Sequence, residues 1–105
     1  MFEQVNHPTH YQNNGKECID LMLEKYGLRA TTNFCILNAF KYIFRCGKKE
    51  GNPDYQELNK AEWYLNWVYK NNVFSDIETL TNILELKNKI DNLRRDIEAN
   101  GTNSQ

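Results

Sequence analysis

The segment from Thr31 to Cys46 constrains the fold more than any other part of the sequence. Apolar side chains occupy ten of its sixteen positions and lie on nearly all sides of a helix, and no glycine or proline interrupts the segment, which predicts a helix. A surface helix shows a single apolar stripe, so a helix that is apolar almost all round must lie at the centre of a domain or be covered by a partner chain. Its polar residues Asn38, Lys41 and Arg45 are three and four positions apart and therefore share one face.

Helices are also predicted on both sides of this segment. Residues 16–27 predict a short helix that ends at Gly27, where a left-handed residue can close it. Thr31 or Thr32 is expected to cap the central helix. After a loop rich in glycine and charge, residues 55–71 predict a third helix with an apolar face and an unusually aromatic sector.

The last helix is expected from Ser75 or Asp76, as its cap, to about Asn100. Its apolar residues alternate at spacings of three and four, as in a coiled-coil seam. We expect this helix to self-associate into a homo-oligomer, and the alternative is an amphipathic helix that folds back on its own domain. The seam is formed by Ile83, Leu86, Ile90, Leu93 and Ile97.

The predicted fold class is therefore all-α, with a compact three-helix domain between an N-terminal arm and a C-terminal amphipathic helix. The arm spans residues 1–15 and the helical domain residues 16–72. The oligomerisation helix spans residues 73–100, and a disordered tail is expected at 101–105.

Charge and composition exclude several classes of protein. The chain of 105 residues has 13 Lys and Arg against 14 Asp and Glu, so no overall field attracts duplex nucleic acid or an anionic membrane. No apolar run is long enough to span a bilayer, and residues 1–10 lack the order of a signal peptide, so a cytoplasmic location is expected. The cysteines Cys18, Cys35 and Cys46 form no CxxC pair and are expected to be reduced thiols.

The arm contains the densest set of polar recognition groups. Its sequence Asn6-His7-Pro8-Thr9-His10-Tyr11 offers donors to a phosphate or a base edge. A structural turn, in which a histidine caps a helix and Tyr11 packs on the core, is an equal alternative. A metal site is disfavoured, because no third ligand has a suitable spacing from His7 and His10.

Lys41 and Arg45, with Lys48 beyond the helix end, form the main cationic cluster. Arginine offers a planar fork to phosphate oxygens and lysine a mobile point charge, although a solvated helix face is the usual place for such residues. Nearby aromatic side chains either stack on a base or pack in the core. They are Tyr42, Trp63, Tyr64 and Trp67.

Acidic pairs are the candidates for holding magnesium. Glu17 and Asp20 are three positions apart on the first helix, a spacing that can place two carboxylates beside a bound phosphate. The sequence has no P-loop, because the segment from Gly47 to Gly51 lacks the required order and a preceding strand. No nucleophile elbow or convincing triad is present either, so no catalytic residue is assigned.

Taken together, these residues resemble a widespread bacteriophage family of small, mostly uncharacterised proteins with an N-terminal NHPxHY signature. The resemblance runs from about residue 5 to residue 68, so the last helix lies outside it. The chain departs from the usual pattern by an insertion at Gly51-Asn52-Pro53. Matching positions are Asn6 to Tyr11, Gly15, Glu17, Ile19, Asp20, Asn38, Lys41, Tyr42, Arg45, Lys48 and Lys60-Ala61-Glu62-Trp63-Tyr64-Leu65.

One member of that family is a phage nucleotide kinase without a P-loop, so the resemblance implies a phage protein with a nucleotide site. A kinase-like phosphoryl transfer on deoxynucleoside phosphates, with Mg²⁺ held by Glu17 and Asp20, is one expectation. Sequestration of a nucleotide or an immune second messenger, as an anti-defence protein, is the alternative. A third hypothesis is a helical module that docks on a host protein. The implied nucleotide-binding residues are His7, His10, Tyr11, Asn38, Lys41, Arg45 and Lys48.

Overall fold

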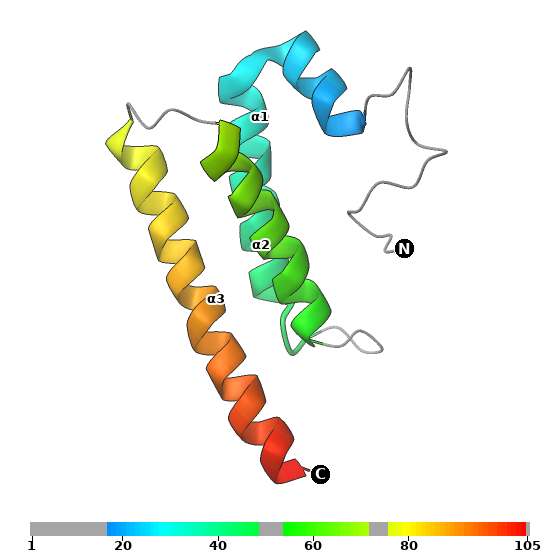
Figure 1. Cartoon of the computed structure of the whole chain (residues 1–105), viewed down its shortest axis with the longest axis vertical. Coiled ribbons are helices and arrows are strands. Elements are labelled where there is room, and N and C mark those ends of the chain that lie inside the picture. The colour runs from blue at the N-terminus through cyan, green and yellow to red at the C-terminus, as the bar shows by residue number, and fades with distance from the viewer. Residues whose placement is uncertain (1–16, 49–53, 72–75, 105) are drawn as a thin grey trace.

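The computed structural model of the chain contains three helices and no strand within residues 17–48, 54–71 and 76–104, which are the residues that the structure describes (Figure 1). Helix α1 spans Cys18–Arg45, α2 spans Asp54–Asn71 and α3 spans Ile77–Ser104. The predicted all-α class is confirmed. None of these helices has the length and apolar character that crossing a membrane requires.

Helix α1 is two helical segments joined at Gly27, which has φ 91° and ψ 171° (Figure 1). The predicted break at this glycine is confirmed, and the positive φ is the reason that glycine is suited to the position. The predicted cap at Thr31 or Thr32 is wrong, because both side chains are buried within the helix. Thr31 Oγ1 instead donates to the carbonyl oxygen of Gly27 over 2.8 Å, so the second segment begins before the threonines.

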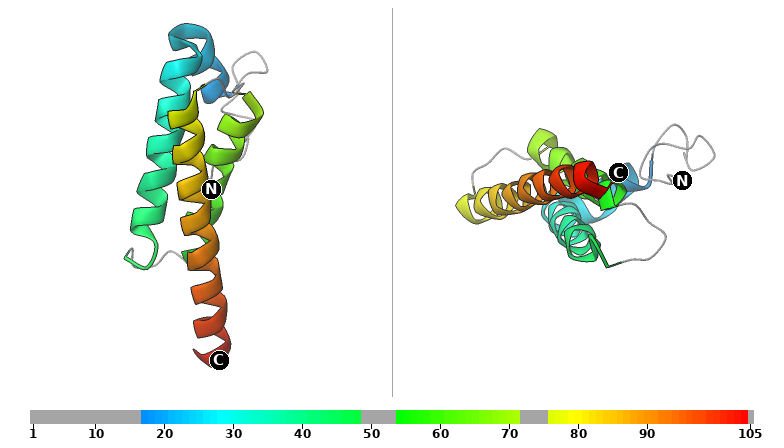
Figure 2. Two further views of the ribbon diagram at one scale, coloured as in Figure 1. Left: turned by 90° about the vertical axis from the view of Figure 1, so that its left-hand side faces the viewer. Right: turned by 90° about the horizontal axis from the view of Figure 1, so that it is seen from below.

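The core lies where the three helices meet. Ala39 and Ala61 are both fully buried in its main cluster, and such small side chains let two helix axes approach closely. Figures 1 and 2 show α1 and α2 running side by side in opposite directions, with α3 along the pair. A second cluster is formed by Cys35, Val68 and Ile83, with one residue from each helix.

Helix α3 folds back on its own domain. Its seam residues Ile83, Leu86 and Ile90 are buried against α1 and α2, and Leu93 and Ile97 are partly buried against the same core. The alternative arrangement from the sequence is therefore the one observed, and self-association through the helix at 73–100 stays a prediction. The seam has the spacing of a coiled coil, but its apolar surface is already covered within one chain.

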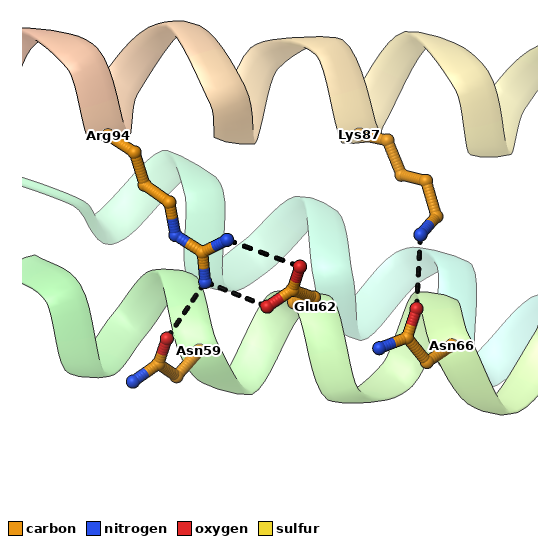
Figure 3. Close-up of polar contacts among 5 residues, drawn as sticks. All are labelled: Asn59, Glu62, Asn66, Lys87 and Arg94. Carbon is orange, nitrogen blue, oxygen red and sulfur yellow. Dashed lines mark hydrogen bonds and ion pairs between the residues drawn. The ribbon is translucent and has the colours of Figure 1, made fainter.

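Polar contacts hold α3 in register along α2 (Figure 3). The Arg94 guanidinium donates to both carboxylate oxygens of Glu62, at 3.2 Å and 2.8 Å, and to Asn59 Oδ1 at 2.8 Å. About two turns earlier in α3, Lys87 Nζ donates to Asn66 Oδ1 over 3.0 Å. A bidentate arginine–carboxylate pair adds geometric specificity to the packing of the apolar seam.

The start of α3 lies where the sequence predicts it, whereas its end lies further along the chain. The Asp76 carboxylate accepts from the backbone N–H groups of Glu78 and Thr79, which confirms the predicted cap at Asp76. Ser75 lies outside the described residues. The helix extends to Ser104, beyond the expected end at about Asn100. No proline follows Asn100, and a single glycine weakens a helix without interrupting its hydrogen bonds.

The buried position of the α3 seam predicts that two aliphatic residues of this helix contribute very differently to the free energy of unfolding. Ile90 is 1% exposed and Leu84 is 57% exposed on the same helix. We expect Ile90→Ala to lower the free energy of unfolding by about 2–5 kcal/mol through a core cavity, and Leu84→Ala by less than about 0.5 kcal/mol. Urea denaturation followed by circular dichroism measures both. Equal, small effects would contradict the packing of α3 on its own domain.

The Glu62–Arg94 contact predicts a dependence of stability on pH. The hydrogen bond from Arg94 lowers the pKa of Glu62, so the pair stabilises the fold above the pKa of the unfolded carboxyl, and this contribution is lost as pH falls through the lowered pKa. We expect Glu62→Gln to reduce stability at pH 7 by less than about 1 kcal/mol, because both side chains are partly exposed. The difference from the wild type should vanish in acid. A difference that grows as pH falls would contradict the assignment.

Candidate anion-binding site

The candidate site lies where the last turns of α1 meet the first turns of α2. The two helices run in opposite directions, so the C-terminal end of α1 and the N-terminal end of α2 are neighbours (Figure 1). Side chains from two distant parts of the sequence therefore converge there. We call them the Tyr42 cluster, which consists of Lys41, Tyr42 and Arg45 from α1 and of Lys60 and Tyr64 from α2.

Three cations surround the ring of Tyr42. Lys41 Nζ lies 4.7 Å from the ring centroid, Lys60 Nζ lies 5.4 Å from it, and Arg45 Cζ lies 5.6 Å from it. Each distance is within the range of a cation–π contact, in which the negative face of the ring attracts the charge. The half-buried ring thus gathers three positive charges from two helices in one place. Such a concentration of cations attracts an anion with several oxygens, such as a phosphate.

Aromatic side chains continue from this ring into the helix interface. Tyr42 and Tyr64 are stacked, with ring centroids 6.0 Å apart and an interplanar angle of 12°. Trp63 and Phe34 meet the Tyr64 ring edge to face, at 5.2 Å and 5.9 Å. Trp67 is partly buried against the second core cluster. The aromatic residues of α2 therefore serve mainly in packing, while Tyr42 stands at the polar border of the packed region.

Burial keeps the two stacked phenols protonated. It raises the pKa of Tyr64 to about 12, and it also raises the pKa of Tyr42, against the opposing influence of the Arg45 charge. At neutral pH both hydroxyl groups are neutral and remain able to donate a hydrogen bond. The positive charge of the cluster is therefore not offset by a tyrosinate.

The buried carboxylate of Glu57 lies close to Arg45. It is 1% exposed, and its Oε1 lies 3.9 Å from Arg45 Nε, whose side chain is 29% exposed. This distance is at the outer limit of an ion pair, so the contact orients the guanidinium without enclosing it. The guanidinium carbon also lies 5.6 Å from the centroid of the Tyr42 ring, so Arg45 contacts both Glu57 and Tyr42.

The predicted site residues fall into three groups, two of which the structure describes. Lys41 and Arg45 belong to the Tyr42 cluster, and Asn38 is half-buried on α1 one turn before Tyr42. Lys48 does not join them, because its Nζ donates to the carbonyl oxygen of Phe44 over 3.0 Å and lies over the Phe44 ring. The third group, His7, His10 and Tyr11, lies outside the described residues.

Glu17 and Asp20 lie at the opposite end of α1 from the Tyr42 cluster. The backbone N–H of Glu17 donates to Asp20 Oδ2 over 3.0 Å, and the two residues form a capping box at the helix start. This structural role accounts for their spacing, and a role in holding Mg²⁺ stays a prediction. Within residues 17–48, 54–71 and 76–104, no group of three or more histidine, cysteine or acidic side chains is arranged to hold a metal ion.

Sequence reasoning did not single out Lys60 or Glu57 as site residues. Lys60 lies one helical turn before Tyr64, the spacing that puts two side chains on the same face, so its place beside the aromatic residues could have been inferred. Its approach to Tyr42 depends on how α2 packs on α1, which no local pattern indicates. The three cysteines are free, as expected, and burial raises the pKa of Cys35 to about 12.

Arg45 and Lys41 should differ in their effect on stability. Arg45→Ala removes the cation beside the buried Glu57 carboxylate, and we expect it to lower the free energy of unfolding by about 2 kcal/mol. Lys41 is exposed, so Lys41→Ala should cost less than about 0.5 kcal/mol. Chemical denaturation measures both. A stability loss in Lys41→Ala as large as that in Arg45→Ala would refute the arrangement.

The comparisons with known proteins concern the part of the chain that holds this site. Residues 5–66 match the model of a family described as protein of unknown function (DUF3310). A search of curated proteins found no match, and a search of solved structures found none either. The matched residues include all of α1 and the first two thirds of α2, and therefore the whole Tyr42 cluster, whereas α3 lies beyond them. Because the match covers more than half of the 105 residues, the chain belongs to the DUF3310 family.

Proposed function

We propose that this protein binds a nucleotide or a nucleotide-like anion at the Tyr42 cluster. The observation that carries the proposal is the convergence of Lys41, Arg45 and Lys60 on one tyrosine ring, within 4.7–5.6 Å of its centroid. The whole chain has a net charge of −1, so this local gathering of cations is not a by-product of a basic composition. It gives a phosphate a local site of attraction.

The chemistry of the cluster suits a phosphate attached to a planar group. A guanidinium donates through a fixed fork to two phosphate oxygens, and the two ammonium groups neutralise the remaining charge. The hydroxyl group of Tyr42 adds a neutral donor at neutral pH. The Tyr42 ring, partly buried and stacked on Tyr64, could contact a base through its remaining exposed part. Together these groups favour a nucleotide over a bare inorganic anion.

A kinase-like activity is the catalytic form of this proposal, and the resemblance to phage nucleotide kinases supports it. A phosphoryl group would pass from a nucleoside triphosphate to the phosphate oxygen of a deoxynucleoside monophosphate, leaving two diphosphates. Positioned cations stabilise the charge of such a transfer. Mg²⁺ would accompany the triphosphate, and Glu17 and Asp20 are the carboxylates proposed to help hold it.

Sequestration of a nucleotide is the non-catalytic form, as expected of an anti-defence protein in an infected cell. The same cations would serve it, with the ligand released unchanged. Docking of a host protein through α3 has less support, since the seam of that helix is buried within the chain. The Tyr42 cluster, and not α3, is therefore the proposed functional region.

A binding experiment with a matched control tests the proposal. Isothermal titration of deoxynucleoside mono-, di- and triphosphates at low salt should show binding to the wild type, and Lys41→Ala/Lys60→Ala should weaken it by roughly 10-fold to 100-fold. The control is Lys25→Ala/Arg29→Ala, which also removes two positive charges, both from exposed positions of α1 outside the cluster. Its affinity should stay within about twofold of the wild type. Absence of binding at millimolar ligand, or an equal loss in the control, would overturn the proposal.

The two forms are distinguished by the fate of the ligand. Incubation of the wild type with a triphosphate, a deoxynucleoside monophosphate and Mg²⁺, followed by chromatography, shows new diphosphates if transfer occurs. Full recovery of both nucleotides from a protein that binds them supports sequestration. In either case the Lys41→Ala/Lys60→Ala variant should lose the observed property.

A further inference from the structure

The side of α1 that faces away from the core carries an exposed apolar stripe. Leu37 is 67% exposed, Phe40 is 54% exposed and Phe44 is 59% exposed. These three residues, which we call the α1 stripe, follow one another at spacings of three and four and so lie along one face. The buried residues Ala39 and Ile43 each lie about 100° around the helix from the stripe residue that follows them, and so belong to a different face. Helix α1 therefore has two apolar faces, of which its own domain covers one.

The position of α1 leaves this stripe at the border of the molecule. In the left view of Figure 2, α1 runs along one side, and α2 and α3 both lie on the same side of it. The earlier expectation for a helix that is apolar almost all round was a central place or a cover from a partner chain. The chain's own helices cover one face of α1 only, so a partner chain is the remaining cover for the α1 stripe.

We propose that a second copy of this chain covers the α1 stripe, by antiparallel packing of α1 against its equivalent about a twofold axis near Leu37. A large aromatic side chain can bury about 150–250 Å². More than half of Phe40 and Phe44 is exposed, so the stripe offers roughly 300 Å² of apolar surface on each chain. With a polar rim, this is the apolar centre that an interface of about 800 Å² per partner requires.

The sizes of the side chains along the stripe fit this antiparallel arrangement. About an axis at Leu37, position 44 of one chain faces position 30 of the other, because each lies seven residues from the axis. The exposed Ala30 is small, and the exposed Phe44 is large. The large Phe44 of each chain thus meets the small Ala30 of the other, which is the self-complementarity that a twofold interface needs.

The charges of α1 favour the same direction. Residues 25–48 contain several lysines and arginines and no acidic residue, so a parallel pair would align like charges. In the antiparallel pair, Lys41 of one chain lies opposite the uncharged Asn33 of the other and Lys48 opposite Tyr26, so that Arg45 and Arg29 form the one pair of like charges within residues 26–48. The net charge of −1 adds no general repulsion between two whole chains.

Sedimentation of substituted proteins tests this interface. At about 100 μM the wild type should sediment at twice its monomer mass of 12.5 kDa, and Phe40→Glu/Phe44→Glu should sediment at the monomer mass with an unchanged circular dichroism spectrum. The control Leu84→Glu places the same charge on an exposed apolar residue of α3 and should leave the dimer intact. A monomeric wild type, whether or not it binds anionic vesicles or another protein, would overturn the proposal. So would a dimer that dissociates in Leu84→Glu alone.

A cross-linking experiment tests the direction of packing. In a Cys18→Ser/Cys46→Ser background, which keeps only the buried Cys35, Leu37→Cys should form a disulfide between two chains on oxidation. Ala30→Cys should not, because two equivalent residues 14 positions apart along an antiparallel pair are about 20 Å from each other. Cross-linking through Ala30→Cys but not through Leu37→Cys would contradict the antiparallel arrangement.

Discussion

The close packing of α1 against α2 is the constraint on which the rest of the structure depends. Two alanines, Ala39 and Ala61, are fully buried in the main core cluster and let the helix axes approach. That approach sets the register in which Lys60 and Tyr64 of α2 meet Tyr42 of α1. Apolar side chains of both helices also pack against the α3 seam. The cationic cluster is thus a direct consequence of how two helices pack.

Much of the fold could be predicted from local patterns. The helical segments, the break at Gly27 and the cap at Asp76 each follow from short stretches of sequence and were confirmed. The cap at Thr31 or Thr32 was wrong because a threonine hydroxyl can also be satisfied inside a helix, here by the Gly27 carbonyl. The α3 seam packs on its own domain, the second of the two arrangements that the sequence left open, because spacing shows that a face is apolar and not which surface will cover it.

The candidate site could be predicted only within each helix. The common face of Lys41 and Arg45 follows from their spacing, and both are in the cluster. Lys48 is not, because beyond the end of α1 its ammonium group donates to a helix carbonyl. Lys60 enters from a helix that begins after a loop, so its approach to Tyr42 is a matter of tertiary packing. Contacts between helices decide which cations converge, and no periodicity within one helix contains that information.

The central claim is that an anion binds where Lys41, Arg45 and Lys60 surround Tyr42. Titration of the isotope-labelled wild type with a deoxynucleoside monophosphate, followed by NMR, tests it most directly, because each residue reports separately. The account predicts that the largest saturable shifts within α1, α2 and α3 occur at these four residues. Shifts confined to α3, or the absence of any saturable shift at millimolar ligand, would contradict it.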